Sequence, residues 1–355
     1  MSIVDRILLG VVSAVQVLLS RMTRYEDRFL RERHPHAVEA SPESPQRAEE
    51  PFEERISCVV GDTSRIGDCK PYLNLDGMLD DGMETMSVFL KTWRGVRKSF
   101  TSLGRNEGLA STQAGSAFYG ELRKLARDYG IDLMGFTQVP RNLIFEGKRI
   151  LFPNAIVCVQ EMKRSAIETA PDTPASLEAL RVYANLGKAM NRLAEFIRSR
   201  GIPCQVGHPL MGPVLYPALA EKAGLGHFGR QGVLITPEFG PRQRIGAIFT
   251  PLEDMPWTDG DEHAWVLDFC DRCNLCVRRC PGRAIYEKPR PNVQGVLTTI
   301  DNAACAPWFS LYLGCSICIK VCPFSRKPYE KIRQAFLNAE TEGVMEDEEA
   351  PLSGS

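Results

Sequence analysis

Hydrophobic residues recur at helical spacing in two stretches near the middle of the chain. The first runs from Phe118 to Gly130, where the glycine ends the predicted helix. The second opens at Thr173, a capping residue followed by a first-turn proline, and ends at Gly201. The residues of its predicted buried face are Leu177, Leu180, Ala184, Leu193 and Ile197, with Tyr183 on or beside them.

Shorter apolar runs predict β-strands between these helices and after them. The predicted strands are 131–139, 155–160, 203–207, 232–236 and 244–250. Strands interrupted by helices, without a regular βαβ repeat, favour an α+β fold. A helical turn is expected at 217–223 and a last helix at 329–339, and the acidic segment 340–355 is expected to be solvated and disordered.

The N-terminal third contains two recognisable patterns. Residues 7–19 are apolar, but they are fewer than the about 18 residues that a membrane-spanning helix needs. No cleavage site follows and no twin-arginine signal precedes them, so they are either a helix docked on protein or an interfacial membrane anchor. Residues 37–55 predict a flexible linker, and 57–115 contain no motif.

Composition and charge place the chain among ordinary soluble proteins. Its 355 residues suggest about two domains, and its net charge of −1 gives no indication of a nucleic-acid partner. Twelve cysteines are present. Cys158 and Cys204 lie in apolar, strand-like runs and are expected in the core, whereas Cys58 and Cys69 are isolated.

The most specific chemical signal is residues 270–281, CDRCNLCVRRCP. They form the C-x2-C-x2-C-x3-C-P pattern that binds iron–sulfur clusters, in which the fourth cysteine ligates the other cluster of a pair. A second run, 315–323, reads CSICIKVCP. The predicted ligands of one 4Fe–4S cluster are Cys270, Cys273, Cys276 and Cys322, and those of the other are Cys280, Cys305, Cys315 and Cys318.

Cys305 is the unusual ligand, because the apolar insertion APWFSLYLG separates it from Cys315. We expect a short helix there that carries Cys305 back to the cluster. A zinc site would use two C-x2-C pairs, which this pattern exceeds, and a disulfide framework suits short secreted chains. Thiolates held for iron imply a reducing compartment, so we expect a cytoplasmic protein.

A glycine-rich segment precedes the cysteines. Residues 224–229, GLGHFG, match G-x-G-x-x-G, but a helix precedes them and a strand follows, the reverse of a dinucleotide-binding site. We expect these glycines to permit a tight turn and the close approach of backbone to a large planar ligand. The candidate cofactor-binding residues are Gly224, Leu225, Gly226, Gly229 and Arg230.

Tyr183 and Arg244 are the candidate catalytic pair, with the phenol as proton donor and the guanidinium nearby. A tyrosine is a poor acid at its ordinary pKa of about 10. A fixed cation favours the phenolate and makes the proton more available. From spacing alone, such a tyrosine is more often a packed core residue and such an arginine more often a surface residue, so the pairing needs further support.

Residues 223–252, AGLGHFGRQGVLITPEFGPRQRIGAIFTPL, closely resemble the hallmark stretch of corrinoid-dependent reductive dehalogenases. Residues 131–140, 154–162 and 182–201 resemble the same family and precede the cluster motifs in the family's order. The resemblance covers roughly residues 117–325.

This resemblance implies a nitroreductase-like α+β core that binds base-off cobalamin, with a C-terminal ferredoxin-like domain holding two 4Fe–4S clusters. Electrons would pass through the clusters to cobalt, which cleaves a carbon–halogen or related bond while a tyrosine supplies the proton. Tyr183 and Arg244 match the family's tyrosine and arginine. A third family position falls near His208 or Pro209, and only His208 has suitable chemistry.

The resemblance also implies domains and partners. The expected divisions are an N-terminal helix and linker (1–56), the core (57–255), the cluster domain (256–328), and a terminal helix with an acidic tail (329–355). The expected partners are a ferredoxin- or flavodoxin-type electron donor and a small organohalide substrate, without nucleic acid. Residues 7–19 are a candidate contact of this cytoplasmic protein with a membrane.

Two other functions remain open. Epoxyqueuosine reductases are a sister group with the same cofactors, but their catalytic Asp–Ser–x–Pro segment falls at residues 210–213, LMGP, which lack the acid. The other alternative is a non-catalytic electron-transfer or corrinoid-handling protein that keeps the clusters.

Overall fold

The computed structural model describes residues 30, 37–39, 82–258, 260–291, 297–312 and 314–348. The apolar segment 7–19, Cys58 and Cys69 lie outside the described residues. Of the predicted linker, residues 37–39 are described. Two of them form β1 (Val38–Glu39), which pairs with β3 (Arg149–Ile150), so this part of the linker is a strand.

A four-stranded antiparallel sheet forms the centre of the molecule. Its order is β2-β4-β8-β5, and its strands are β2 (Leu133–Gln138), β4 (Asn154–Glu161), β8 (Gln243–Thr250) and β5 (Gln205–Gly207). All four were predicted from short apolar runs. β4 and β8 are buried along most of their length, which explains why they read as nearly continuous apolar segments.

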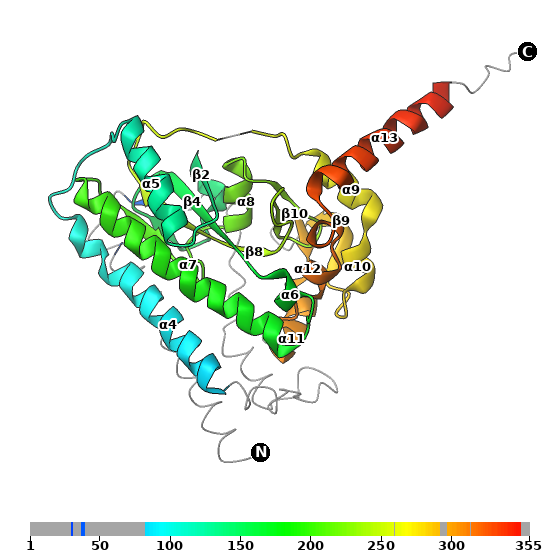
Figure 1. The fold of residues 1–355 in the computed structure, drawn as a ribbon, viewed down its shortest axis with the longest axis horizontal. Coiled ribbons are helices and arrows are strands. Elements are labelled where there is room, and N and C mark those ends of the chain that lie inside the picture. Colours follow the sequence, from blue (N-terminus) through cyan, green and yellow to red (C-terminus); the bar gives the residue numbers. More distant parts are fainter. Residues whose placement is uncertain are drawn as a thin grey trace, which may run out of the picture.

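Helices cover both faces of the sheet (Figure 1). On one face, α5 (Ser116–Asp128) and α7 (Thr173–Ser199) pack against Phe136, Ile156 and Ile248. On the other face, the short helix α8 (Tyr216–Lys222) packs against Val157 and Ala247. Alternate residues of each strand therefore enter two separate cores, as the two-residue period of a strand requires.

The helix α4 (Gly82–Thr101) lies alongside α7, on the side away from the sheet (Figure 1), and was not predicted. Its buried side includes the polar residues Thr92 and Ser99, whose hydroxyls donate to the carbonyls of Val88 and Gly95 within the helix. Polar groups that are satisfied inside the helix weaken the apolar periodicity, so the pattern was not visible in the sequence.

The remaining elements are short and mostly belong to a lobe at the C-terminal side of the core. They are η1 (Leu103–Asn106), η2 (Arg141–Leu143), α6 (Arg164–Ile167), β6 (His227–Phe228), β7 (Leu234–Ile235), α9 (Trp265–Cys273), α10 (Leu275–Arg279), β9 (Ile285–Pro291), β10 (Leu297–Ile300), α11 (Asn302–Leu311), α12 (Ile317–Val321), η3 (Pro323–Ser325) and α13 (Tyr329–Glu348). The helix α13 continues beyond its predicted end into the acidic segment, which is therefore helical as far as Glu348.

Aromatic rings form the core of this cysteine-bearing lobe. Trp265 lies at the centre, with its ring centroid 5.0 Å from that of Tyr329 and 5.8 Å from that of Phe324. Phe269 and Phe336 complete the group. Large rings bury much apolar area per residue, which lets a lobe of short helices hold a defined shape.

The cysteine-bearing lobe is attached to the core through α12 and α7. Ile319 and Cys318 of α12 pack against Ala179 and Val182 of α7. The Ser176 hydroxyl donates to the carbonyl of Tyr312 at 2.6 Å. These contacts fix the lobe at the part of α7 that contains Tyr183.

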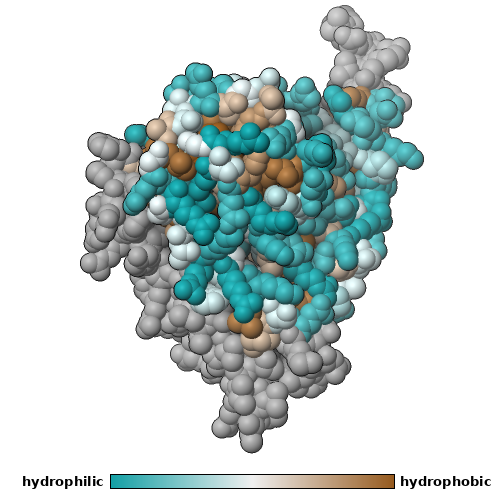
Figure 2. Space-filling model, turned by 60° about the vertical axis from the view of Figure 1, so that its left-hand side comes forward, coloured by the Kyte–Doolittle hydropathy of each residue, from teal (hydrophilic) through white to brown (hydrophobic). Residues whose placement is uncertain are grey.

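None of the helices in the described part of the chain is both long and apolar enough to cross a membrane. Figure 2 shows a mostly hydrophilic face, on which hydrophobic side chains form small, separate groups.

Replacing Gly187 with alanine should destabilise the protein. The new Cβ would lie 2.0 Å from Nε2 of the buried His208, so the α7–His208 contact must open, which costs about 1–3 kcal/mol. The measurement is the thermal midpoint of anaerobically purified protein.

Gly120→Ala is the matched control, because its Cβ meets nothing within 4 Å on the helix α5. Alanine is favoured over glycine in helices, so this control should be as stable as the wild type or more so. Equal midpoints for the two variants would contradict the packing described here.

Candidate functional site

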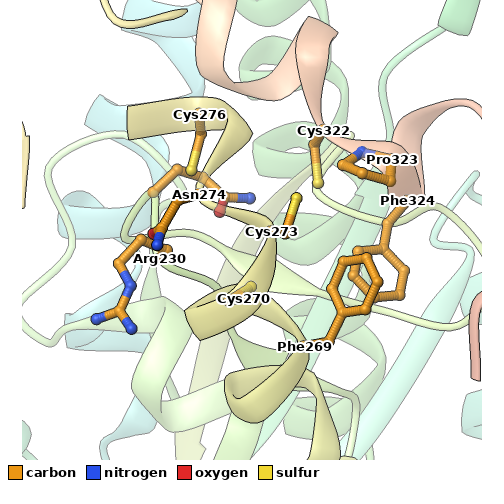
Figure 3. A pocket seen from close by; sticks show the side chains of 10 residues that line it. Arg230, Phe269, Cys270, Cys273, Asn274, Cys276, Cys322, Pro323 and Phe324 are labelled. Carbon is orange, nitrogen blue, oxygen red and sulfur yellow. The ribbon is translucent and has the colours of Figure 1, made fainter. Parts of the chain in front are cut away.

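Four of the predicted cluster ligands line one cavity. Cys270 and Cys273 come from α9, Cys276 comes from α10, and Cys322 follows α12 (Figure 3). The cavity thus brings three cysteines of the first motif together with the last cysteine of the second. The motif predicts this arrangement, because the last cysteine of each motif ligates the other cluster of the pair. We call these residues the first cysteine set.

The second group of predicted ligands also comes together. Burial, together with the nearby thiols of Cys276, Cys315, Cys305 and Cys280, raises the pKa of the Cys318 thiol to about 12. Three of these four neighbours are the other predicted ligands of the same cluster. The helix α11 contains Cys305, so the apolar insertion carries it toward this group as expected. We call Cys280, Cys305, Cys315 and Cys318 the second cysteine set.

A left-handed residue inside each motif explains why the thiols converge. Asn274 has φ +45° and separates α9 from α10, directly after Cys273. Ser316 has φ +53° and precedes α12, directly after Cys315. A single left-handed residue turns the chain sharply, and asparagine tolerates this conformation better than most residues. The sequence analysis did not identify either residue, although their equal positions in the two motifs were a visible signal.

Thiol geometry in the lobe differs from that of a single-ion site. Among the described residues, no three cysteine, histidine or acidic side chains converge as ligands of one metal ion would. Zinc thiolates all lie about 2.3 Å from their ion. The thiols of the first cysteine set instead line one cavity between α9, α10 and the end of α12.

Arg230 lies in the wall of the first cysteine set. It is 1% exposed, pairs with Asp271, and donates a backbone hydrogen bond to Cys270. Burial raises the pKa of the Cys270 thiol, whereas this hydrogen bond and the positive charge of Arg230 act in the opposite direction. The Nε and Nη1 atoms of Arg230 are buried and have no hydrogen-bond partner among the described residues.

The glycine-rich segment packs mainly against the protein itself. A Cβ on Gly224, where φ is +67°, would lie 2.0 Å from the carbonyl oxygen of Thr258. A Cβ on Gly226 would lie 2.1 Å from that of Ile235. The close backbone approach that we expected from a ligand is thus made by neighbouring protein at these two positions, and Leu225 packs in the core beneath the sheet.

The candidate catalytic pair is in contact. The Arg244 guanidinium lies over the Tyr183 ring, with Cζ 4.9 Å from the ring centroid. Tyr183 is part of α7, and Arg244 stands near the start of β8, where it pairs with Gln160 of β4. A guanidinium over an aromatic face is attracted by the negative electrostatic potential of that face, which fixes the ring's orientation. Nε of Arg244 is buried without a partner among the described residues.

His208, the third candidate, is buried between α4 and α7. Its Nε2 faces Gly187 and Gly95, and its Nδ1 accepts a hydrogen bond from the Leu210 backbone at 3.1 Å. Burial lowers the pKa of His208 from 6.5 to about 4. The side chain is therefore neutral near pH 7 and packed inside the protein, while Pro209 lies against Gly246.

Neither of two cavities in the described structure includes the tyrosine. One is formed by the first cysteine set, and another, of about 190 Å³, lies between α5 and β2 beside Arg123 and Arg127. Tyr183 and Arg244 line neither of them. The other expected core cysteines, Cys158 and Cys204, are fully buried, and burial raises the pKa of each thiol to about 12.

Comparison with known proteins identifies relatives by sequence. No family model matches the chain. It is 34% identical over 185 residues to a tetrachloroethene reductive dehalogenase of Sulfurospirillum multivorans, covering 49% of this chain and 36% of that relative. It is 32% identical over 150 residues to an epoxyqueuosine reductase of Gloeobacter violaceus, covering 39% of this chain and 45% of that relative.

Solved structures show a related fold. A catabolic reductive dehalogenase superposes with a TM-score of 0.64 at 18% identity, over 85% of this chain and 44% of that one. A second reductive dehalogenase, described for B12-dependent dehalogenation, superposes with a TM-score of 0.54 at 21% identity, over 64% of this chain and 34% of that one. The predicted mixture of helices and strands is thereby confirmed.

The relatives found by sequence are all oxidoreductases. The chain is a relative of the reductive dehalogenases, with the epoxyqueuosine reductases as a sister group, so the predicted resemblance is confirmed. It spans about a third of the length of the dehalogenase relatives that it matches, 36% in the case given above.

The buried His208 predicts a pH dependence of stability. Below its ordinary pKa of 6.5 the unfolded chain takes up a proton that the folded protein accepts only near pH 4. The stability that the neutral side chain contributes is therefore complete above about pH 6.5 and is lost as the pH falls toward 4. His208→Asn should lose this dependence, so its thermal midpoint should fall less than that of the wild type between about pH 7 and about pH 5. If the thermal midpoints of the wild type and His208→Asn fell equally with pH, the burial of a neutral His208 would be contradicted.

Proposed function

We propose that this protein is a corrinoid- and iron–sulfur-dependent reductase of the reductive dehalogenase type. The observation that carries the proposal is the attachment of the second cysteine set to α7. Cys318 packs against a hydrophobic cluster that includes Val182, the residue before Tyr183, and the Arg244 guanidinium lies over the Tyr183 ring. A redox centre in the lobe would thus be close to a proton donor in the core.

The eight cysteines fit two 4Fe–4S clusters. The first cysteine set surrounds one cavity, and the second set lies together beside α12. Thiolates are the ligands that such clusters use, and iron favours the deprotonated form against the effect of burial. In this proposal residues 256–328 are a ferredoxin-like domain and residues 57–255 are a nitroreductase-like core.

Unpaired polar groups between the lobe and the core fit a corrinoid with amide side chains. Buried donor nitrogens without a partner among the described residues occur on Arg230, Gln231, Arg242 and Arg244. The loop with Arg230 adjoins the start of β8, because Gln243 donates to the carbonyl of Leu234 at 2.7 Å. Buried donors normally find an acceptor, and amide carbonyls of a bound cofactor would supply them.

The proposed reaction replaces a carbon–halogen bond by a carbon–hydrogen bond. Two electrons and one proton enter, and a halide leaves. When bound, the corrinoid supplies a reduced cobalt that reacts with the carbon–halogen bond. The Tyr183 hydroxyl donates the proton, and Arg244 holds the ring in position and supplies positive charge beside it. A ferredoxin- or flavodoxin-type protein donates the electrons, and the substrate is a small organohalide.

Two alternatives remain as outcomes of the tests. In an epoxyqueuosine-reductase-like enzyme residues 210–213 would carry an acid, whereas Leu210 and Met211 here pack against Val96. A protein that binds both clusters but no corrinoid would be an electron-transfer protein.

Anaerobic reconstitution with iron, sulfide and cobalamin tests the proposal. We expect about eight iron atoms per chain, four for each cluster, and one tightly bound corrinoid with the spectrum of its base-off form. Turnover of halogenated ethenes and phenols is then measured with a reduced viologen. Protein that retains its iron but takes up no corrinoid would refute the proposed function.

Tyr183→Phe should leave iron and corrinoid contents unchanged and lower the rate of dehalogenation by about 100-fold or more, because the proton donor is lost while the ring remains over Arg244. Tyr129→Phe is the matched control. The Tyr129 ring is covered in the same way by Arg192, which belongs to another part of α7, so this variant should retain full activity. Full activity of Tyr183→Phe would remove Tyr183 from the reaction.

Cys305→Ala should remove one ligand of the second cysteine set, so the iron content should fall toward about four atoms per chain. Cys204→Ala is the control, because Cys204 is buried in the core beside α7 and should keep the full iron content. An unchanged iron content and cluster spectrum in Cys305→Ala would assign the eighth ligand to another residue.

A further inference from the structure

Positive charge is concentrated around the second cysteine set, although the whole chain has a net charge of −1. Residues 272–290 contain six arginines and lysines and a single acidic residue, Glu287. Five of these basic residues follow one another on α10, the next turn and β9, and all five are exposed: Arg278, Arg279, Arg283, Lys288 and Arg290.

Three of these cations lie immediately around Cys280. Arg278 and Arg279 precede it, and the backbone N–H of Arg283 donates to the Cys280 carbonyl at 3.1 Å. The next residue, Ala284, donates its N–H to Cys280 Sγ at 3.3 Å. The turn thus holds the thiol and the cations together. We call Arg278, Arg279, Arg283 and Lys288 the basic surface.

The second cysteine set is the more exposed of the two. All four of its cysteines are half-buried, whereas in the first set only Cys273 is half-buried, and Cys270, Cys276 and Cys322 are 7%, 8% and 6% exposed. Electron transfer between proteins requires a short path from one redox centre to the other. The second set is therefore the better placed entry point, and the basic surface lies around one of its cysteines, Cys280.

The cations of the basic surface form no ion pair with a carboxylate in the part of the chain that the structure describes. By contrast, many other arginines of the molecule do, such as Arg200 with Glu121 and Arg181 with Glu84. Unpaired charges of one sign produce a potential that extends about 8–10 Å into solvent at physiological ionic strength. Such a potential attracts a partner of opposite charge and raises its association rate.

We propose that the basic surface docks an acidic one-electron carrier protein, which reduces the cluster of the second cysteine set. The proposal rests on the proposed function, because it requires a cluster at this position. In each encounter the carrier loses one electron and the cluster gains it, without bond formation or proton transfer. A nucleic acid would also be attracted by the charge, but one face of Tyr286, the tyrosine within this segment, is already covered by Arg290 and is not available for stacking with a base.

The test uses the iron-loaded full chain and a triple variant, Arg278→Gln/Arg279→Gln/Arg283→Gln. Dithionite-reduced acidic flavodoxin is the probe, and bleaching of the cluster absorbance is followed by stopped flow. We expect the second-order rate constant of the triple variant to be at least about tenfold lower at low ionic strength. The wild-type rate should fall steeply with added salt, and that of the variant should fall much less.

Two controls separate docking from damage to the cluster. Lys91→Gln/Arg94→Gln/Lys124→Gln removes the same charge from exposed residues on α4 and α5, and should behave as the wild type does. The methyl viologen radical cation is not attracted by the basic surface, so it should reduce the triple variant at least as fast as the other two proteins, which shows that its clusters are intact. Because bleaching is read at the clusters, absence of a corrinoid or of turnover would refute the proposed function without affecting this result.

Equal flavodoxin rates in the wild type and the triple variant would overturn the proposal, and so would a wild-type rate that does not depend on salt. Fluorescence anisotropy with a labelled RNA stem-loop examines the other class of partner. RNA binding that is lost in the triple variant while the flavodoxin rate is unchanged would reassign the surface to nucleic acid.

Discussion

The packing of α12 against α7 is the contact on which the rest of the arrangement depends. Ile319 of α12 shares a hydrophobic cluster with Ala179 and Val182 of α7, and Cys318 packs against that cluster, so the cysteine-bearing lobe meets the core near Tyr183. The segment with Arg230 and Gly240 fills the space between the two, because Gly240 lies against the backbone of Phe324 and Arg230 lies against Cys270.

Local chemistry could be predicted from the sequence better than long-range packing. The cysteine spacing is a local constraint, since left-handed residues at Asn274 and Ser316 suffice to turn each motif inward. The long helix α7 was visible because its buried face is mostly apolar, despite the buried polar residues Ser176, Glu178, Asn191 and Arg198. By contrast, α4 was missed, because Thr92 and Ser99 on its buried side satisfy their hydroxyls within the helix.

The glycine-rich segment illustrates what periodicity and motifs leave undetermined. The sequence indicated close backbone approach at Gly224 and Gly226, and the structure has it, but the neighbours are Thr258 and Ile235. Which atoms approach a glycine depends on segments far away in the chain. The same holds for Tyr183 and Arg244, whose contact follows from the packing of α7 on β8. His208 was a candidate only because its position resembles one in the reductive dehalogenase family. Its burial between two helices depends on tertiary packing, which the sequence pattern does not show.

A crystal structure of the chain loaded anaerobically with iron, sulfide and cobalamin tests the central claim most directly. Anomalous scattering at the cobalt and iron absorption edges locates both metals independently of any activity. The account predicts two compact iron peaks, one within each cysteine set, and a cobalt peak between the first cysteine set and the Tyr183 hydroxyl. Cobalt found at another position, or iron peaks without any cobalt, would contradict it.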